Sequence, residues 1–531
     1  MRKEFLIISI VLIVSLSGGG FVWKPAWKIL LLLSPFLAIG YQDFFQKRHA
    51  IRRNFPILGR FRYMLEMIRP EIQQYFIESN TEGAPFSREQ RSLVYQRSKK
   101  VLDTIPFGTQ LDVYEEGYEW INHSMVPTKV DASQLRIQIG GKNCTQPYLA
   151  SILNISAMSY GSLSQNAILA LNGGAKDGGF AHNTGEGGLS HYHQTPGGDL
   201  IWQIGTAYFG CRDEHGAFSE ALFKKQAQLD AIKMIEIKLS QGAKPGHGGI
   251  LPKEKLTPEI AKIRGVSMGK DIISPPGHSA FSTPIEMMEF VERLRSLSGG
   301  KPVGIKLCLG RRREFLAVAK AMVETGITPD YIAVDGGEGG TGAAPVEFSN
   351  HIGTPGVEAL IFVHNVLKGM GLRDQVKVIA SGSVTSGFGI IKRLALGADL
   401  IYSARAFMLS LGCIQALRCN ANVCPAGVAT QDPYLTAGLV VEDKRKRVRN
   451  FHQVTLDEVA HMIGAMGLSH SSDLHPWHIM RRVNQWEIKH YGEIFDYLSD
   501  GSLLNREEVP QAYARAWRMA KAESFEAADT V

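Results

Sequence analysis

The chain has 531 residues, which is long for one domain and predicts either a large domain with attached segments or two to three domains. Hydrophobic residues make up 44% of it, enough for a sizeable core. The net charge of +7 is modest, and no basic arm, helix-turn-helix, zinc-finger or RNA-stacking pattern occurs, so we expect no nucleic-acid partner. Six cysteines are too few for a disulfide scaffold and are typical of a reducing compartment.

The first 46 residues are predicted to be a membrane anchor. Residues 5–23 form an uncharged, largely apolar run, and a second apolar run follows at 29–41. A spanning helix needs about 20 mostly apolar residues, so the first run qualifies and the second does so only with its flanking residues. A hairpin of two spanning helices is favoured over one. A cleaved signal peptide and a buried helix are the alternatives, although no convincing cleavage site follows.

Basic residues flank both ends of this apolar region. Arg2 and Lys3 precede it. The following side carries Lys47, Arg48, Arg52, Arg53, Arg60 and Arg62. Because Lys and Arg concentrate on the cytoplasmic side of membrane proteins, both ends of the anchor and the rest of the chain are expected in the cytoplasm. Lys24 and Lys28, between the two runs, argue against this orientation.

The rest of the chain divides into three segments. Residues 47–135 are predicted to be a helical, charged connector and 441–531 a helical C-terminal extension. Between them, over 136–440, short β-rich runs alternate with helical stretches. The predicted strands are 151–156, 199–205, 231–239, 302–308, 331–336, 376–382 and 399–404. The predicted helices are 166–177, 284–298, 312–325, 356–371 and 387–397. Seven or eight such units favour an α/β fold of the (β/α)8 TIM-barrel type.

Unusual loops follow the predicted strands, where a barrel carries its active site. "AMSYGSLS" (157–164) offers small residues against which a flat ligand can lie. Glu186 stands in "HNTGEGG", and Lys244 stands among the glycines of "SQGAKPGHGG". Backbone N–H groups and an ammonium in one loop can bind a carboxylate or a phosphate.

Further along the chain, Lys306 lies in an apolar strand, which is unusual for a lysine without a partner. "DGGEGGTGAAP" (335–345) follows the next strand, and "ASGSVTSG" (380–387) and "SARAF" (403–407) follow the last two, the usual phosphate site of a barrel. Each feature also has an interpretation without a ligand. A glycine-rich loop is often only a turn, and Lys306 could be an ion-paired residue at a strand end. Glu186 could be a solvated loop acid, and Met158 a core residue. Because all these loops fall at one face of one barrel, we expect a flat, phosphorylated cofactor, with flavin mononucleotide (FMN) the obvious candidate.

Half of the cysteines, Cys413, Cys419 and Cys424, lie within twelve residues of each other. A disulfide framework, a metal site, a redox cluster and coincidence are all open interpretations. A zinc site normally has a fourth ligand, and no fourth Cys or His lies nearby in the sequence.

The motifs "SAMSYGSLS", "NTGEGG", "QGAKPGHGG", "ISPPGH", "DGGEGGTGAAP" and "LGCIQALRCNANVCPAGVATQDP" together resemble the synthase domain of glutamate synthase. The resemblance is colinear over about 140–435 and extends to the stand-alone FMN-binding members of that family. It implies an FMN-dependent oxidoreductase acting on the CH–NH2 group of donors. The reaction would convert 2-oxoglutarate and ammonia, through 2-iminoglutarate, to glutamate.

The resemblance also implies roles for individual residues. Glu186 would stand near the ammonia entry, and Lys244 and Arg264 would bind 2-oxoglutarate. The implied FMN contacts are Ala157, Met158, Ser159, Lys306, Gly336, Gly337, Gly382, Ser383, Ala404 and Arg405. Cys413, Cys419 and Cys424 have the C-x5-C-x4-C spacing on which the family holds a [3Fe–4S] cluster.

Three positions depart from the family pattern and bear on these expectations. Asn420 stands where His is usual, which could shift the cluster potential. His247 and Ile250 replace acidic or amide residues and put the 2-oxoglutarate contact in doubt. A related reaction on another 2-oxo or amino acid, such as N-methylglutamate synthesis, therefore stays open.

The resemblance also bears on partners. The chain begins "MRKEF" without the N-terminal cysteine of a glutamine-hydrolysing domain, so ammonia is expected from solution or from a glutamine amidotransferase partner. Electrons are expected from another, unknown protein. A membrane-tethered electron-transfer protein with flavin and cluster but no turnover is the alternative outside the enzymes.

Overall fold

The computed structural model describes residues 1–505 and 509–526. By its internal contacts the chain divides into two compact units, Met1–Arg88 and Glu89–Val531. We call them unit 1 and unit 2 and treat each separately.

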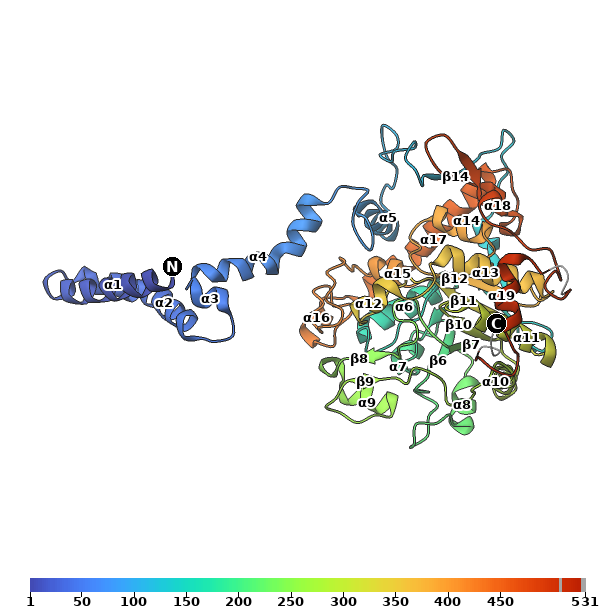
Figure 1. Ribbon diagram of the computed structural model, residues 1–531, viewed down its shortest axis with the longest axis horizontal. Helices are drawn as coiled ribbons and strands as arrows, with labels where there is room; N and C mark the ends of the chain where they lie inside the picture. Colours follow the sequence, from blue (N-terminus) through green and yellow to red (C-terminus); the bar gives the residue numbers. More distant parts are fainter. Residues whose placement is uncertain (506–508, 527–531) are drawn as a thin grey trace. The chain divides into compact units, whose positions relative to one another are not determined.

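Unit 1 begins with two long apolar helices, α1 (Arg2–Val22) and α2 (Pro25–Phe45) (Figure 1). They pack antiparallel: the rings of Phe5 and Tyr41 lie 5.6 Å apart, and those of Phe21 and Trp27 lie 5.8 Å apart. Each helix is 21 residues long and apolar enough to cross a membrane, and most of its surface is exposed. Length and composition alone also fit a signal sequence. The second run thus reaches spanning length, because the helix includes both flanks.

Unit 1 continues through α3 (Ala50–Asn54), α4 (Leu58–Ile72) and a π-helical turn η1 (Gln73–Ile77). A buried carboxylate joins α4 to α2: Asp43 accepts from Arg60 Nε at 2.7 Å and from Arg60 Nη2 at 2.8 Å. The same carboxylate accepts the backbone N–H of Ile57 at 3.2 Å, at the start of α4.

The boundary between the units falls at the first residue of α5 (Arg88–Lys99), and the chain after this helix departs from the predicted helical connector. Residues 100–131 are mostly irregular, with only the strand β1 (Glu119–Ile121). Asp112 accepts the N–H of Tyr114 at 2.9 Å, a local turn that competes with a helix. The prediction of helix is therefore wrong for this stretch, because polar side chains and Pro106 favour turns.

Eight parallel strands of unit 2 form a closed barrel in the order β10-β11-β12-β13-β4-β5-β6-β7. They are β4 (Leu153–Ile155), β5 (His182–Asn183), β6 (Leu200–Ile204), β7 (Ile232–Lys238), β10 (Val303–Leu307), β11 (Tyr331–Asp335), β12 (Lys377–Ser381) and β13 (Leu400–Ser403). The predicted TIM barrel is confirmed. Seven of the strands coincide with the apolar runs that predict them. The eighth, β5, has two residues, too few for a periodic pattern.

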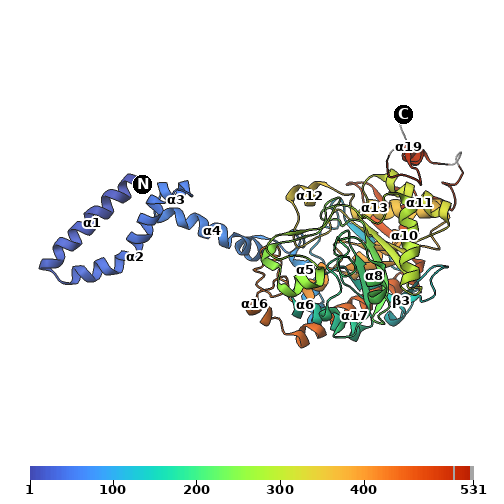
Figure 2. The same cartoon turned by 90° about the horizontal axis from the view of Figure 1, so that it is seen from below.

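Helices surround the strands (Figure 2). They include α6 (Gln165–Gly178), α8 (Glu220–Ala227), α10 (Pro284–Leu297), α11 (Arg312–Thr325), α13 (Gly356–Gly369) and α14 (Gly387–Ala395). Their ends follow local signals. Ser164 caps α6 by accepting the N–H of Ala167, and Gly179 ends that helix at φ 65°. Thr283 and Glu286 form a capping box at the start of α10, and Pro284 occupies its first turn.

A hairpin closes the amino-terminal end of the barrel. Strands β2 (Arg136–Ile139) and β3 (Tyr148–Ser151) pair just before β4. Ile139 and Ala150 of the hairpin join a buried cluster inside the barrel with residues at the starts of strands, such as Tyr331 and Leu400. The opposite, carboxyl-terminal end is therefore the one that offers space for a site.

Short elements complete unit 2. They are η2 (Ala132–Gln134), α7 (His191–Gln194), β8 (Ile250–Leu251), η3 (Lys253–Lys255), α9 (Pro258–Arg264), β9 (Ile272–Ile273), α12 (Val346–His351), α15 (Arg405–Ser410) and α16 (Pro433–Ala437). After the barrel come α17 (Val441–Ala465), η4 (Ser471–Asp473), η5 (Pro476–His478), β14 (Ile479–Arg482), β15 (Ile488–His490), α18 (Tyr491–Ile494) and α19 (Gln511–Met519). The C-terminal extension is thus helical only in part, because β14 and β15 pair with β1 in an antiparallel sheet.

Candidate active site

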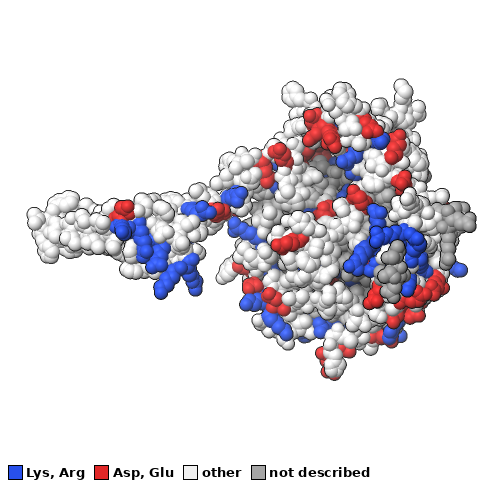
Figure 3. Space-filling view, in the orientation of Figure 1, with Lys and Arg blue, Asp and Glu red and all other residues white. Residues whose placement is uncertain are grey.

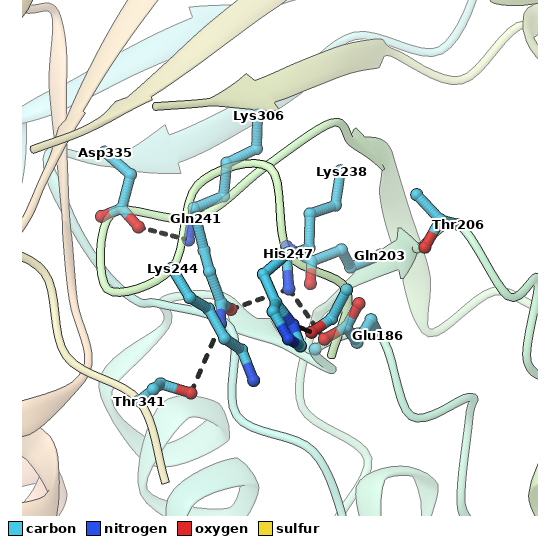
Figure 4. A network of polar contacts seen from close by, with 12 residues as sticks. Glu186, Gln203, Thr206, Lys238, Gln241, Lys244, His247, Lys306, Asp335 and Thr341 are labelled. Carbon is cyan, nitrogen blue, oxygen red and sulfur yellow. Dashed lines mark hydrogen bonds and ion pairs between the residues drawn. The ribbon is translucent and has the colours of Figure 1, made fainter. Parts of the chain in front are cut away.

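Polar side chains converge at the carboxyl ends of the barrel strands (Figure 4). Strand β7 contributes two of them, because alternate residues of a strand face the same side. Glu236 points into the barrel and accepts from the side-chain amides of Asn183 at 2.8 Å and Gln203 at 2.7 Å. Lys238, two residues on, ends the strand and is also buried.

Glu186 and Lys238 form the centre of this cluster. The carboxylate of Glu186 lies 2.8 Å from Lys238 Nζ, which also donates to Gln241 Oε1 at 2.7 Å. Burial alone would raise the pKa of Glu186, but the charges of Lys238, Lys244 and Arg264 outweigh it and hold the pKa below its ordinary value. Glu186 is therefore an anion at neutral pH.

The other two cations predicted for the site, Lys244 and Arg264, lie close enough to Glu186 to act on its pKa. Lys244 is buried, donates to the carbonyl of Ala343 at 2.8 Å, and has its pKa lowered by burial to about 8. Arg264, at the end of α9, is also buried, which lowers its pKa to about 10. Its Nε finds no hydrogen-bond partner among the described residues. The structure thus brings together three predicted residues, Glu186 from the loop after β5 and Lys244 and Arg264 from the long connection after β7. With Lys238 they form a cluster with more positive than negative charge, which can bind an anion.

Sequence reasoning missed Lys238 and Gln241. A signal was present for Lys238, because it shares the inward face of β7 with Glu236 in strict alternation. Gln241 also approaches Thr341 Oγ1 at 3.4 Å, which links the loops after β7 and β11. His278 accompanies Lys238, with its Nε2 2.9 Å from the backbone carbonyl of that lysine.

Glycine is required where these loops touch. A Cβ at Gly242 would lie 1.7 Å from the carbonyl oxygen of Gly336, and one at Gly249 would lie 2.2 Å from Glu186 Oε1. The N–H of Gly242 also donates to Asp335 Oδ2 at 2.8 Å. Two loops from different strands are therefore held in backbone contact, which positions the glycine-rich segments predicted for the ligand.

We expect Gly242→Ala to destabilise this mouth of the barrel by about 1–3 kcal/mol, since the methyl group must displace backbone and not a movable side chain. Thermal unfolding measures the loss. Gly310→Ala is the matched control, because a Cβ there meets nothing within 4 Å. Equal unfolding temperatures for the two variants would contradict the expectation.

Lys306 and Asp335 stand beside this cluster. Lys306 Nζ lies 3.7 Å from Asp335 Oδ2, and both side chains are buried (Figure 4). Burial would raise the pKa of Asp335, but Lys306, the N–H of Gly242 and other neighbours lower it below its ordinary value. The predicted lysine is thus a paired cation that ends inside the barrel mouth. Gly336 and Gly337 follow Asp335 directly, and the N–H of Gly337 donates to the carbonyl of Thr354 at 2.8 Å.

The residues predicted for a phosphate lie together after β12 and β13. Arg405 Nη2 donates to Ser383 Oγ at 2.8 Å and to the carbonyl of Glu338 at 2.9 Å. Gly382 has φ 112°, and Ala404 directly precedes α15. Arg393, which sequence reasoning missed, is half-buried and donates to the carbonyl of Gly382 at 3.0 Å. Two guanidinium groups beside a glycine and a hydroxyl suit a dianion.

The small residues after β4 form the remaining wall. The N–H of Met158 donates to the carbonyl of Asn183 at 3.2 Å, and Met158 is buried. Ala157 and Ser159 on either side are half-buried. A Cβ at Gly185 would lie 2.8 Å from the backbone nitrogen of Ser159, so the loops after β4 and β5 are in contact.

The cysteine segment packs on this same wall. Gln431 donates to the carbonyls of Gly161 and Leu163 at 3.1 and 2.9 Å, and Ser164 donates to that of Gly427 at 2.7 Å. Asn422, at φ 60°, reaches the carbonyl of Glu254 at 2.9 Å. The segment is thus built onto the loops that follow β4 and β8.

The three thiols are neighbours, but they do not form the predicted ligand set. Burial, with a smaller contribution from Cys419 and Cys424, raises the pKa of Cys413 to about 12. Burial likewise raises the pKa of Cys419, again with a contribution from Cys424. Across residues 1–505 and 509–526, no three His, Cys, Asp or Glu side chains are arranged to hold a metal ion. The thiols suit a cluster by chemistry and nearness, and not by their present arrangement.

The positions that depart from the family pattern lie in different segments: His247 in the loop before β8, Ile250 in β8, and Asn420 in the cysteine segment. Ile250 of β8 is half-buried and pairs with Ile273 of β9. His247 Nδ1 lies 2.9 Å from the carbonyl of Gly248, and its ring meets that of Phe348 at 5.4 Å. Ile250 brings no charge to the site, unlike Lys244 and Arg264.

Comparison with known proteins relates the chain to a family. Residues 109–469 match the family described as the conserved region in glutamate synthase. The chain is 39% identical to the glutamate synthase large subunit-like protein YerD of Bacillus subtilis, over 85% of this chain and 94% of that protein. It is 34% identical to the archaeal glutamate synthase [NADPH] of Methanocaldococcus jannaschii, over 66% of this chain and 65% of that protein.

Solved structures are more distant. Mandelate oxidase with 3,3-difluoro-2-hydroxy-3-phenylpropionic acid has a TM-score of 0.41 at 18% identity, covering 78% of this chain and 95% of that one. A mutant flavocytochrome b2 with benzoylformate has a TM-score of 0.43 at 13% identity, covering 85% and 92%. The family assignment rests on the sequence matches, which extend over more than half of the chain. This chain belongs to the glutamate synthase family.

Proposed function

We propose that the protein is an FMN-dependent oxidoreductase that converts 2-oxoglutarate and ammonia to glutamate. The observation that carries the proposal is the grouping of three buried cations, Lys238, Lys244 and Arg264, around Glu186 at the barrel mouth. A dicarboxylate needs two or more fixed cations, and a protein that only carried electrons would gain nothing from them.

FMN fits the remaining groups of the site by chemistry. Arg405, Ser383, Gly382 and the N-terminus of α15 at Ala404 would hold the phosphate, with Arg393 as a second cation. The flavin ring would lie on Ala157, Met158 and Ser159, and the ammonium of Lys306 would face its electron-rich edge. Gly336 and Gly337 would allow close approach of the backbone. Bound FMN in its reduced form supplies the hydride that reduces the imine.

The protein's own side chains bind the two substrates. Lys244 and Arg264 bind the carboxylates of 2-oxoglutarate, and Lys238 exchanges its contact with Glu186 for the substrate. Glu186, an anion at neutral pH, holds the ammonium that becomes the attacking ammonia. Condensation releases water and forms 2-iminoglutarate. Addition of a hydride and a proton to its C=N bond completes glutamate.

A related reaction on methylamine is the second candidate, and His247 and Ile250 favour keeping it. The half-buried side chain of Ile250 provides an apolar surface on which the methyl group of methylamine can pack. The experiment is to incubate the full chain, loaded with FMN and reduced chemically, with 2-oxoglutarate and either ammonia or methylamine. Glutamate from ammonia supports the first proposal, N-methylglutamate supports the second, and neither product overturns both.

We expect Arg405→Ala to weaken FMN retention on the order of tenfold to hundredfold, since it removes a charge-assisted contact to the phosphate. Flavin released on dialysis measures this. Arg311→Ala is the control, because Arg311 is exposed and forms an ion pair with Glu314, three residues on, at 3.7 Å. Equal flavin content in both variants would contradict the assignment.

We also propose that Cys413, Cys419 and Cys424 hold a [3Fe–4S] cluster. Support comes from their spacing, their nearness and the suitability of thiolates as ligands. Binding would require the side chains to turn toward one centre and lose their protons. Iron and acid-labile sulfide in the anaerobically purified protein test this. We expect Cys424→Ser to lose both and Cys144→Ser to keep both, and the absence of iron from the unmodified protein would refute the proposal.

We propose further that α1 and α2 anchor the protein in a membrane with the barrel in the cytoplasm. The support is their length, their exposed apolar surface and the basic residues on both flanks. In this arrangement residues 1–46 form the anchor, 47–135 the connector, 136–440 the catalytic barrel and 441–531 the extension. Electrons come from a partner protein, and ammonia from solution or an amidotransferase partner. Extraction from membranes by detergent but not by salt is the expected result.

A further inference from the structure

Unit 1 contains a segment that the proposed reaction does not use and that combines positive charge with exposed apolar side chains. Between residues 47 and 72 the sequence has seven Lys and Arg residues against two Glu residues. The basic ones are Lys47, Arg48, Arg52, Arg53, Arg60, Arg62 and Arg69. Figure 3 shows basic side chains gathered near α3. The opposite ends of α1 and α2 carry only two basic residues, Lys24 and Lys28. Segments of this kind are attracted to anionic lipid.

Helix α4 is amphipathic, and its apolar face is uncovered. Leu58, Phe61, Leu65 and Ile68 follow the i, i+3, i+7, i+10 pattern of one helix face. Their exposed fractions are 52%, 54%, 55% and 37%. Large apolar side chains in a continuous stripe are normally covered by another surface. The length of the stripe, about three turns, is enough for a helix lying in a membrane interface.

Basic residues stand at the edge of this stripe. At 100° per residue, Arg62 and Arg69 lie next to Leu58 and Leu65 on the helix surface. Both arginines are exposed. A long guanidinium side chain beside an apolar face can lie along it and keep its charge at the headgroup level. Helix α4 therefore combines an apolar face that can enter the lipid with basic side chains that can reach the headgroups.

The fold fixes where this helix begins. Asp43, near the end of α2, is buried and paired with Arg60, and it also accepts the N–H of Ile57. The start of α4 is therefore held against the last turn of the second apolar helix. If α2 ends at the membrane surface, α4 starts there too, on the side that carries the basic residues.

We propose that α3 and α4 form an interfacial segment that binds the anionic phospholipid headgroups of the membrane that holds α1 and α2. This goes beyond the proposed reaction and rests on the proposed membrane insertion. Its effect is to keep the chain at the lipid surface where it leaves the anchor. The anionic headgroups neutralise the excess of basic residues, and the acyl region covers Phe61 and Leu65.

Hydrogen–deuterium exchange on the full chain tests the proposal. The protein is placed in lipid nanodiscs of phosphatidylcholine alone or of phosphatidylcholine with phosphatidylglycerol. We expect the amides of residues 58–72 to exchange on the order of tenfold more slowly with phosphatidylglycerol. Arg48→Glu/Arg62→Glu/Arg69→Glu should abolish this difference. Lys224→Glu/Lys225→Glu/Lys446→Glu, which makes the same charge change on lysines of unit 2, should leave it intact.

A second variant separates the two parts of the surface. Phe61→Ser/Leu65→Ser should speed exchange of residues 58–72 in both lipids, because it removes the apolar depth. Equal exchange rates in the two lipids for the unmodified chain would overturn the proposal, as would protection that persists in the triple arginine variant. Rapid exchange of α1 and α2 in the discs would refute membrane insertion and this proposal together. Glutamate formation is measured separately and bears on neither.

Discussion

Lys244→Met is expected to raise KM for 2-oxoglutarate on the order of tenfold to hundredfold and to change kcat less. The reason is that a charge-assisted hydrogen bond to a carboxylate is worth about 1.5–3 kcal/mol, and Met keeps the length and apolar stem of lysine. Burial of Lys244 makes the contact stronger than an exposed ion pair would be. Steady-state kinetics with a chemical reductant measure both constants.

Lys301→Met is the matched control for this variant. Lys301 is another buried lysine, and its Nζ donates to the carbonyls of Ala227 and Leu229 at 2.7 and 2.8 Å. It lies just before β10, at the closed end of the barrel. We expect Lys301→Met to lower the unfolding temperature but to leave KM unchanged. If Lys301→Met and Lys244→Met raised KM equally, the assignment of Lys244 to the substrate would fail.

Glu186→Gln is expected to lower kcat/KM at least ~30-fold, since removing one partner of a buried charge group costs about 2–5 kcal/mol. The loss should be greatest at limiting ammonia, because the amide cannot hold an ammonium ion as the carboxylate does. Lys238, now without its ion-pair partner at 2.8 Å, would also be left buried and uncompensated.

The same variant has a pH signature. Burial lowers the pKa of Lys244 to about 8, and the charge of Glu186 opposes that lowering. In the unmodified protein, Lys244 is cationic below about pH 8 and loses its proton above it, so KM for 2-oxoglutarate should rise on the alkaline side. Without the Glu186 charge the pKa of Lys244 falls further, so the rise should begin at lower pH.

A pH profile of kcat/KM for both proteins measures this shift. Glu214→Gln is the control, because Glu214 is 86% exposed and lies outside the site. Its profile should match that of the unmodified protein. An alkaline limb at the same pH in Glu186→Gln would show that the carboxylate and Lys244 are not coupled as described.

The barrel was predictable because its signals are local. Each of the seven predicted strands is an apolar run bounded by turn residues, and the helices between them carry caps such as Ser164 and Thr283. β5 could not be predicted, since two residues carry no period. The prediction of helix for residues 100–131 is wrong. Their charged composition occurs both in exposed helices and in surface loops, so composition does not distinguish the two.

Which types of residue the candidate site contains was also predictable from the sequence. Which of these side chains contact one another was not. Glu186 and Lys244 stand out as charges in glycine-rich loops, whereas Arg264 was expected only from the family resemblance. That Lys238 pairs with Glu186, and that Arg393 joins Arg405 beside Gly382, depends on which strands are neighbours in the closed barrel. Sequence distance does not encode those neighbours.

The cysteines show the difference between what the sequence determines and what only the tertiary structure determines. Their spacing and their number follow from the chain alone, as do the lengths of the apolar N-terminal runs. The pKa of Cys413 near 12, the depressed pKa of Lys244 and the backbone contact of Gly242 with Gly336 follow only from folding. Spacing is a property of neighbouring residues, whereas burial and electrostatic coupling sum over every element that packs around a group.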